Sequence, residues 1–272
     1  MTGAMGSFTA GDGAKIVYEI HGDRASKRRA TLVHSLAMDH AYWRPVAERL
    51  VKAGACAVAL DCRGHGGSAK PAGPYSMDRF ADDLSDLSDH LDWDKSVVAG
   101  SSMGGSVTLA FAARHGARVA GLALIDTTAW YGEDAPKAWA GRANTAVEKG
   151  LSALIDFQLT RWFGDEFKAA RPDVVKNCVD VFLANDVAAY AATCVMLGSF
   201  DLRAKLPSFK FPTRICVGEE DYATPPAMAQ TLHQGVSGST YTLLPKARHL
   251  TPLERPDEVA AEILAVLKSI HG

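Results

Sequence analysis

Short apolar runs recur along this chain, and they constrain its fold more than any other feature. They cover residues 31–34, 55–60, 96–99, 121–125, 213–217 and 240–244, and the alternating stretch KIVYEI at 15–20 precedes them after a GDG turn. Runs this short and this apolar are typical of β-strands that are buried on both faces of a sheet.

Helical patterns separate these runs. After Ser76, a plausible N-cap, apolar residues recur at helical spacing from Met77 to Leu91, and a second such pattern follows Pro256 and extends to Ile270. Strands that alternate with helices predict an α/β fold with a mostly parallel central sheet flanked by helices.

One interval breaks the alternation. Residues 131–206 contain no convincing strand and carry helical, aromatic-rich text. We therefore expect a core built from residues 8–130 and 207–272, with residues 131–206 inserted as a helical cap over the strand ends. An ordinary peripheral helical insertion is the alternative. The segment 1–7 (MTGAMGS) is interpreted as a cloning scar or a disordered end.

Composition excludes several classes of function. The formal net charge is −2, so no basic surplus points to nucleic acid, and no apolar stretch reaches the length of a membrane span. The five cysteines are widely spaced without a C-x-x-C pair, which favours a reducing, cytoplasmic environment. No metal-binding motif is present, so we expect neither a metal nor an organic cofactor. A homo-oligomer is left open.

A glycine-rich turn follows the run at 96–99. Residues 100–105 read GSSMGG, which fits the nucleophile-elbow pattern G-x-S-x-G only with Ser102 at its centre, because position 99 is alanine and excludes Ser101. Glycine-rich turns also bind phosphates, but neither G-x-G-x-x-G nor a P-loop lysine is present. The motif therefore predicts Ser102 as a nucleophile.

A serine needs a general base, and His249 is the predicted base. In folds with this elbow the chain order is Ser, then Asp or Glu, then His. His249 lies in LLPKARHLTPLERP, after the last expected strand and before the last expected helix. Most other histidines precede the serine; His115 follows it too closely, His233 sits in a helical stretch, and His271 is at the chain end.

The orienting acid is predicted to be Asp221. It ends ICVGEED, directly after an expected strand, where functional groups of open α/β sheets collect. Asp126 also ends an expected strand and is the rival.

An oxyanion needs hydrogen-bond donors as well. We expect the backbone N–H of Met103, at the start of the elbow helix, and that of Leu36, in LVHSLAMDHAYW, with Ser35 as the next choice.

With these pieces placed, the chain resembles the α/β-hydrolases over nearly its whole length. DCRGHGGSAKP at 61–71 is similar to that family's D-x-R-G-x-G-x-S turn. HSLAMDHAYW, GPYSMDRFADD, DYATPP and RHLTPLERPDEV resemble segments of the 3-oxoadipate enol-lactonases, as does the insertion through Trp139, Arg142 and Arg161-Trp162-Phe163. His34, Ala37 and Ser101 depart from that pattern, where Asn, Gly and Leu are expected.

This resemblance implies a serine hydrolase that opens a small carboxylate-bearing enol-lactone in aromatic-compound catabolism. Arg142, Arg161, Trp139 and Ser35 are the expected substrate-binding residues. The arginines are chosen because a carboxylate in an apolar cleft needs a cationic partner; the alternative is that they are surface charges whose stems cover apolar area. A general carboxylesterase, a C–C bond hydrolase or a cofactor-free perhydrolase would share the triad, and a non-enzymatic ligand receptor on the same scaffold is the remaining alternative.

Overall fold

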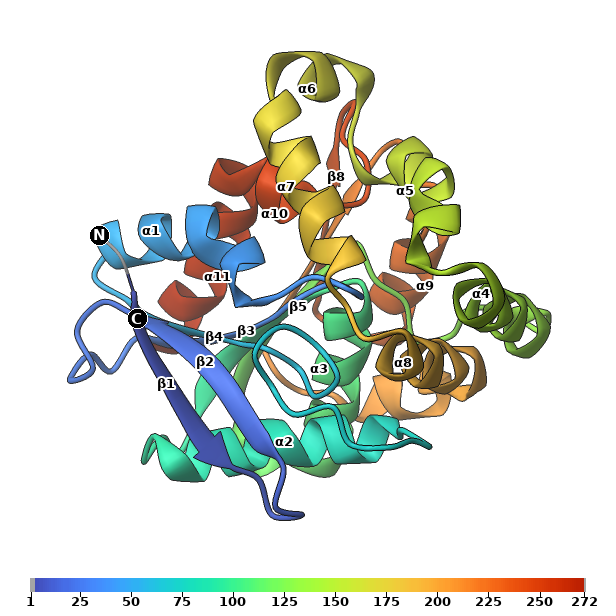
Figure 1. Ribbon diagram of the computed structural model, residues 1–272. Helices are drawn as coiled ribbons and strands as arrows, with labels where there is room; N and C mark the ends of the chain where they lie inside the picture. The colour runs from blue at the N-terminus through green and yellow to red at the C-terminus, as the bar shows by residue number, and fades with distance from the viewer. Residues whose placement is uncertain (1–2, 272) are drawn as a thin grey trace.

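A mixed sheet of eight strands runs through the protein, whose computed structural model describes residues 3–271 (Figure 1). The strand order is β1-β2-β4-β3-β5-β6-β7-β8. β1 and β2 pair antiparallel to their neighbours, and every pairing from β4 to β8 is parallel. The strands are β1 (Ala4–Thr9), β2 (Lys15–His21), β3 (Arg29–Val33), β4 (Cys56–Leu60), β5 (Ser96–Ser101), β6 (Val119–Ile125), β7 (Thr213–Gly218) and β8 (Thr240–Leu244).

The strands predicted from apolar runs are all present, within two residues at each end. β4 and β5 are buried along their whole length, as expected for interior strands. The expectation of full burial is wrong for β8, where Thr240 and Leu243 are exposed. The reason is position: β8 pairs only with β7 and forms the edge of the sheet.

The prediction of a disordered N-terminal end is wrong for residues 4–7. They belong to β1, which pairs with β2 in the register Ala4↔Ile20 to Thr9↔Lys15. Its sequence, AMGSFT, carries little apolar signal, and Phe8 is its one buried residue. Backbone pairing through a tight hairpin holds this strand instead. Residues 1 and 2 of the same predicted segment lie outside the described residues.

Helices cover both faces of the sheet. α1 and α11 pack against each other on one face, and α2, α3 and α9 cover the other (Figure 1). The predicted N-cap of α2 is confirmed, because the Ser76 side chain accepts a hydrogen bond from the Arg79 N–H. The core helices are α1 (Arg44–Lys52), α2 (Met77–His90), α3 (Met103–Arg114), α9 (Pro226–Gly235), α10 (Thr251–Glu254) and α11 (Pro256–His271).

Five further α-helices occupy the interval between β6 and β7. They are α4 (Ala135–Lys149), α5 (Ile155–Trp162), α6 (Asp165–Ala170), α7 (Pro172–Leu183) and α8 (Val187–Ser199), and we refer to them as the inserted helices. α4 and α8 pack side by side (Figure 1). Within residues 3–271 no single helix has the length and apolarity to cross a membrane; α7 and α8 reach that threshold only jointly, and they are bent by 97° where they meet.

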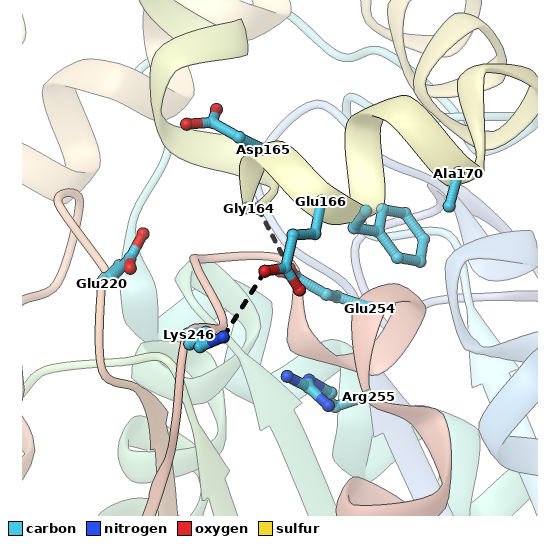
Figure 2. Close-up of a pocket in the computed structure, with 9 residues that line it drawn as sticks. Gly164, Asp165, Glu166, Ala170, Glu220, Lys246, Glu254 and Arg255 are labelled. Carbon is cyan, nitrogen blue, oxygen red and sulfur yellow. Dashed lines mark hydrogen bonds and ion pairs between the residues drawn. The ribbon is translucent and has the colours of Figure 1, made fainter.

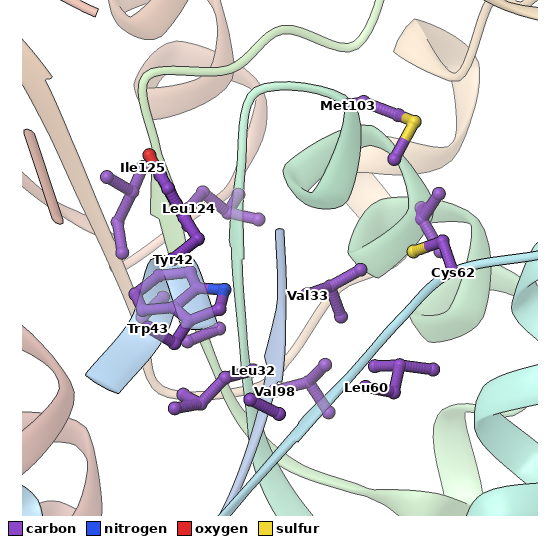
Figure 3. Close-up of a cluster of buried hydrophobic side chains, with 14 of the residues drawn as sticks. Leu32, Val33, Tyr42, Trp43, Leu60, Cys62, Val98, Met103, Leu124 and Ile125 are labelled. Atoms are coloured by element: carbon purple, nitrogen blue, oxygen red, sulfur yellow. The ribbon is translucent and has the colours of Figure 1, made fainter. Parts of the chain in front are cut away.

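The central strands are held by a dense apolar cluster. Figure 3 shows Leu32 and Val33 of β3, Val98 of β5 and Leu124 of β6 packed near Trp43. These side chains are essentially inaccessible to water. Each buried side chain of this size contributes roughly 1.5–3 kcal/mol relative to exposure. The ends of β3 and β5 are therefore fixed points from which the loops depart.

Strand order creates a crevice at those ends. From β3 the chain crosses to β4 on one side, whereas β5 returns to the other side of β3. The loops after β3 and β5 therefore diverge, and ligands of open α/β sheets bind at such a switch point. The segments after Val33 and after Ser101 lie there.

Candidate active site

Ser102 lies on a sharp turn between β5 and α3. Its backbone has φ 56° and ψ −121°, a conformation that costs a non-glycine residue energy. The turn is held by hydrogen bonds from the Ser102 N–H to the Ile125 carbonyl (2.9 Å) and from the Thr127 hydroxyl to the Ser102 carbonyl (2.7 Å). This is the geometry of a nucleophile elbow, which presents one hydroxyl at the top of the sheet.

The glycines of the motif are required by close packing. A Cβ on Gly100 would lie 2.2 Å from the carbonyl oxygen of Gly104, and a Cβ on Gly104 would lie 2.1 Å from that of Val33. Both contacts are with backbone, which cannot move aside. The pattern G-x-S-x-G is therefore a packing requirement of this strand–turn–helix.

The two neighbouring serines have different surroundings. The Ser101 hydroxyl is fully buried and lies 2.8 Å from the Tyr42 hydroxyl. The Ser102 hydroxyl lines a pocket and lies 2.8 Å from Nε2 of His249. Only Ser102 combines access to a ligand with a neighbouring base.

His249 lies in the loop between β8 and α10, as the sequence predicted. Its Nε2 meets Ser102, and its Nδ1 lies 2.8 Å from Oδ2 of Asp221. The carboxylate next to Nδ1 favours the tautomer with a proton on Nδ1, which leaves Nε2 free to accept the serine proton.

Asp221 follows β7 and is almost inaccessible to water. Its Oδ1 accepts hydrogen bonds from the backbone N–H groups of Ala223 (2.8 Å) and Thr224 (2.9 Å), and its Oδ2 accepts one from the Thr224 hydroxyl (2.9 Å). These donors hold the carboxylate in one orientation toward His249.

Asp126, the rival acid, is also buried but does not contact His249. It accepts hydrogen bonds from the Gly218 N–H (3.0 Å) and from the N–H and hydroxyl of Thr251. Burial and the nearby Asp221 carboxylate raise the pKa of Asp126 well above its usual value. Its hydrogen bonds join the end of β7, which precedes the Asp221 loop, to the start of α10, which follows the His249 loop.

Two backbone donors sit beside Ser102. Met103 begins α3, and Leu36 lies in the loop after β3 and lines the same pocket as Ser102. Within residues 3–271 neither the Leu36 nor the Met103 N–H has a protein acceptor. Buried N–H groups are rarely left unpaired, so both are available to a ligand oxygen.

His34 orients the Leu36 peptide. Burial lowers the pKa of His34, which favours the neutral ring. The Cys62 N–H donates to its Nε2 (3.0 Å), which leaves the proton on Nδ1 to donate to the Ser35 carbonyl (2.8 Å). Because a trans peptide is planar, fixing the Ser35 carbonyl turns the Leu36 N–H to the opposite side.

Ala37 occupies a left-handed conformation with φ 61°. Glycine adopts this conformation without steric cost, so alanine is strained at this position. The Ala37 carbonyl accepts a hydrogen bond from Nδ2 of Asn185 (2.9 Å), which lies between α7 and α8. The inserted helices therefore also hold the loop that carries Leu36.

A pocket of about 550 Å³ opens over Ser102. Its core wall carries Ser35, Leu36, Ser102 and His249, and its opposite wall comes from the inserted helices and the residues just before them. The second wall carries four aromatic side chains, Tyr131, Trp139, Phe157 and Trp162. This volume suits a small organic ligand.

Arg142 and Arg161 line the same pocket, and Asp134 is the acidic residue among its lining. Arg142 donates to the Tyr190 hydroxyl (2.6 Å) and lies over the Trp139 ring, and Arg161 lies over the Phe157 ring at 3.9 Å. In the described part of the chain neither guanidinium forms an ion pair. Burial and the nearby Arg142 charge lower the pKa of Arg161.

Comparisons with known proteins identify the family to which this chain belongs. Residues 31–256 match the family described as alpha/beta hydrolase fold. The chain belongs to the alpha/beta hydrolase family. The resemblance seen in the sequence and the predicted fold class are thereby confirmed.

This hydrolase is similar to named enol-lactonases. The 3-oxoadipate enol-lactonase 2 of Acinetobacter baylyi is 31% identical over 214 residues, which cover 79% of each chain. The crystal structure of the enol-lactonase from Burkholderia xenovorans has a TM-score of 0.91 and 33% identity, and the alignment covers 97% of this chain and 100% of that one. A thermophilic esterase from Thermogutta terrifontis, solved with malate bound, has a TM-score of 0.91 at 28% identity, with 99% and 100% covered. The chain is thus an enol-lactonase-like α/β hydrolase.

The structure of this hydrolase adds residues that sequence reasoning missed. Thr224 holds Asp221, and Tyr131, Phe157 and Tyr190 line the pocket or contact its arginines. These residues follow no fixed spacing from the motif, so a single sequence offers no signal for them. Among the described residues no group of three or more His, Cys, Asp or Glu side chains is arranged to hold a metal ion.

Proposed function

We propose that this protein hydrolyses a small lactone or ester through an acyl-enzyme formed on Ser102. The observation that carries the proposal is the continuous hydrogen-bonded path Ser102–His249–Asp221, 2.8 Å at each step, which opens into the pocket. A serine hydroxyl within reach of an imidazole that a carboxylate orients is the arrangement that activates serine nucleophiles.

In the proposed reaction the Ser102 oxygen attacks the carbonyl carbon while Nε2 of His249 takes the hydroxyl proton. The N–H groups of Met103 and Leu36 bind the developing oxyanion, helped by the positive end of α3. His249 then gives its proton to the leaving oxygen. In a lactone that oxygen stays tethered as a hydroxyl of the acyl group. Water, deprotonated by His249, finally releases the carboxylic acid and restores Ser102.

The substrate that the pocket favours carries a carboxylate. Arg142 and Arg161 bring positive charge into a partly buried, aromatic pocket without an ion-pair partner among the described residues. An anionic substrate would supply that partner. Similarity to a 3-oxoadipate enol-lactonase, and to an esterase solved with malate, a dicarboxylate, supports the same substrate class. We therefore propose a 3-oxoadipate enol-lactonase-like lactone hydrolase in aromatic-compound catabolism, with the inserted helices as its substrate-selecting cap.

The decisive experiment is a substrate panel. Carboxylate-bearing enol-lactones, neutral lactones and short neutral esters are compared by kcat/KM on the same preparation, with Ser102→Ala as the blank. We expect the anionic enol-lactones to rank first. A neutral ester in first place would make the protein a carboxylesterase, and a C–C bond or peracid product would indicate the corresponding related activity.

A chromogenic ester separates turnover from mere binding. An acyl-enzyme predicts a burst of chromophore with an amplitude near one per chain, followed by slower steady-state release. Saturable binding without any burst or turnover would make the protein a receptor on a hydrolase scaffold.

A cytoplasmic location is part of the proposal. The five cysteines of the chain are all free and buried, which suits a reducing compartment.

A further inference from the structure

The loop that carries His249 is hydrogen-bonded to the inserted helices. The His249 N–H donates to the carbonyl of Arg161 (3.3 Å), and the Leu250 N–H donates to that of Trp162 (3.0 Å). Arg161 and Trp162 end α5, and the last carbonyls of a helix have no partners within it. The last two carbonyls of α5 thus accept hydrogen bonds from the histidine loop, and we call this contact the junction.

Arg248 strengthens this junction. Its Nη1 donates to the carbonyls of Phe163 (3.1 Å) and Thr160 (3.3 Å), and its Nε faces Glu220, beside Asp221, at 3.4 Å. The Arg248 side chain is nearly buried, and a cation is favourable at the negative end of a helix. One guanidinium therefore contacts the inserted helices and the acid loop together.

Glu254 links the two sides of the junction through its carboxylate. Its Oε1 accepts a hydrogen bond from the Gly164 N–H, just after α5, and its Oε2 accepts one from the Arg248 N–H, both at 3.0 Å. Figure 2 shows the Glu254 carboxylate beneath Gly164, beside a cavity of about 470 Å³. A Cβ on Gly164 would lie 2.8 Å from Oε1 of Glu254 and 2.9 Å from the Lys246 carbonyl, so the fit is tight.

The same turn of α5 also forms the pocket wall, because Arg161 and Trp162 line the substrate pocket. The backbone of His249 is therefore hydrogen-bonded directly to this wall of the pocket. We propose that Arg248 and Glu254 are positioning residues that couple the placement of the inserted helices over the substrate to the placement of the His249 ring against Ser102. This inference rests on the proposed function for its kinetic consequences.

Three variants test the coupling from different sides. Arg248→Met keeps the apolar stem and removes the guanidinium, and Arg248→Lys keeps the charge without the fork that reaches the two carbonyls and Glu220 together. Glu254→Gln turns one acceptor into a donor that faces an N–H. Gly164→Ala disturbs the junction through a substitution that lies outside the histidine loop in the sequence, by pressing a Cβ against Glu254 and the Lys246 carbonyl.

We expect kcat to fall about 10- to 100-fold in Arg248→Met, Glu254→Gln and Gly164→Ala, because a misplacement of about 1 Å in a catalytic group has effects of this size. Arg248→Lys should not rescue kcat. The neighbouring Lys246→Met is the matched control: Lys246 pairs with Glu166 at 3.4 Å on the exposed rim of the same cavity, and its kcat should stay within about twofold because exposed ion pairs contribute little.

A spectroscopic measurement makes the test independent of substrate. The low-field proton NMR signal of the His249 Nδ1–H, assigned with Asp221→Asn, reports the His249–Asp221 hydrogen bond. The proposal predicts that this signal shifts in Gly164→Ala and Glu254→Gln and not in Lys246→Met.

If folded variants keep both kcat and the His249 signal of the parent, and only their melting temperatures change, the junction is a stabilising contact and the proposal is overturned. If the parent hydrolyses no ester or lactone, the proposed function fails, while the NMR signal still decides the coupling.

Discussion

The two walls of the pocket differ in how their polar groups are held. On the core wall, His249 contacts Ser102 through one ring nitrogen and Asp221, behind the wall, through the other, and backbone N–H groups and Thr224 further fix Asp221. On the inserted wall, Arg142 and Arg161 are held by aromatic rings and one tyrosine hydroxyl, and Phe157 is 40% exposed.

The difference indicates a division of labour. Groups that must transfer a proton need fixed partners, because their geometry decides the rate. Groups that select a substrate can keep unpaired charge, which the substrate itself neutralises. In the function proposed above, the core wall carries the reaction and the inserted wall its specificity, so variants on each side should fail in different ways.

The largest effect is expected from the elbow. Ser102→Ala should lower kcat by a factor on the order of 10⁴ or more, since only binding and the oxyanion donors would remain. Ser101→Ala removes a buried hydrogen bond to Tyr42 and should cost far less. Steady-state kinetics on a chromogenic ester measures both, and equal losses would contradict the assignment of Ser102.

Substitutions of the two buried carboxylates, Asp221 and Asp126, should have different effects on activity and stability. Asp221→Asn should lower kcat roughly 10⁴-fold, because the amide favours the wrong tautomer of His249. Asp126→Asn sets an amide donor against the donors of Gly218 and Thr251, and should cost about 1–3 kcal/mol of stability. Its kcat, measured well below its melting temperature, should stay much closer to that of the parent. Loss of activity in Asp126→Asn alone would make Asp126 the orienting acid.

A variant on the inserted wall should change specificity. Removing the arginine that binds the substrate carboxylate should reduce kcat/KM for an anionic lactone by roughly 10- to 100-fold, equivalent to about 1.5–3 kcal/mol in a charged hydrogen bond. A neutral ester should be nearly unaffected. The anionic-to-neutral ratio is compared for Arg142→Ala, Arg161→Ala and the parent, and an unchanged ratio in both variants would favour a neutral substrate.

The smallest effect is expected at Ala37, where the core loop meets the inserted helices. Ala37→Gly relieves left-handed strain of about 1–2 kcal/mol, while the freer unfolded chain opposes this by about 0.4–1 kcal/mol. The net change should be a stabilisation between about zero and about 1.6 kcal/mol, seen as a slightly higher melting temperature. A clear destabilisation would show that Ala37 is not strained.

Much of the sheet and of the turn at Ser102 could be predicted from the sequence alone. Buried strands are recognisable in the sequence as short apolar runs. The glycines around Ser102 are required because a Cβ at those positions would overlap neighbouring backbone atoms. β1 was not predicted because it is held in the sheet by backbone pairing, which does not depend on side-chain type. The exposure of β8 was not predicted either, because the position of a strand in the sheet does not follow from its own residues.

The sequence by itself determined the strand–helix alternation, the elbow at Ser102, and the chain order that places an acid and a histidine in later loops. Only the tertiary structure decided which neighbours these residues have. It brought Asp221 rather than Asp126 to His249, set two arginines into one pocket, and joined the end of α5 to the histidine loop. The physical reason is that periodicity and steric fit act between residues close in the chain. The hydrogen bonds of this site join residues as far apart as Ser102 and His249, whose meeting depends on the order of strands in the sheet.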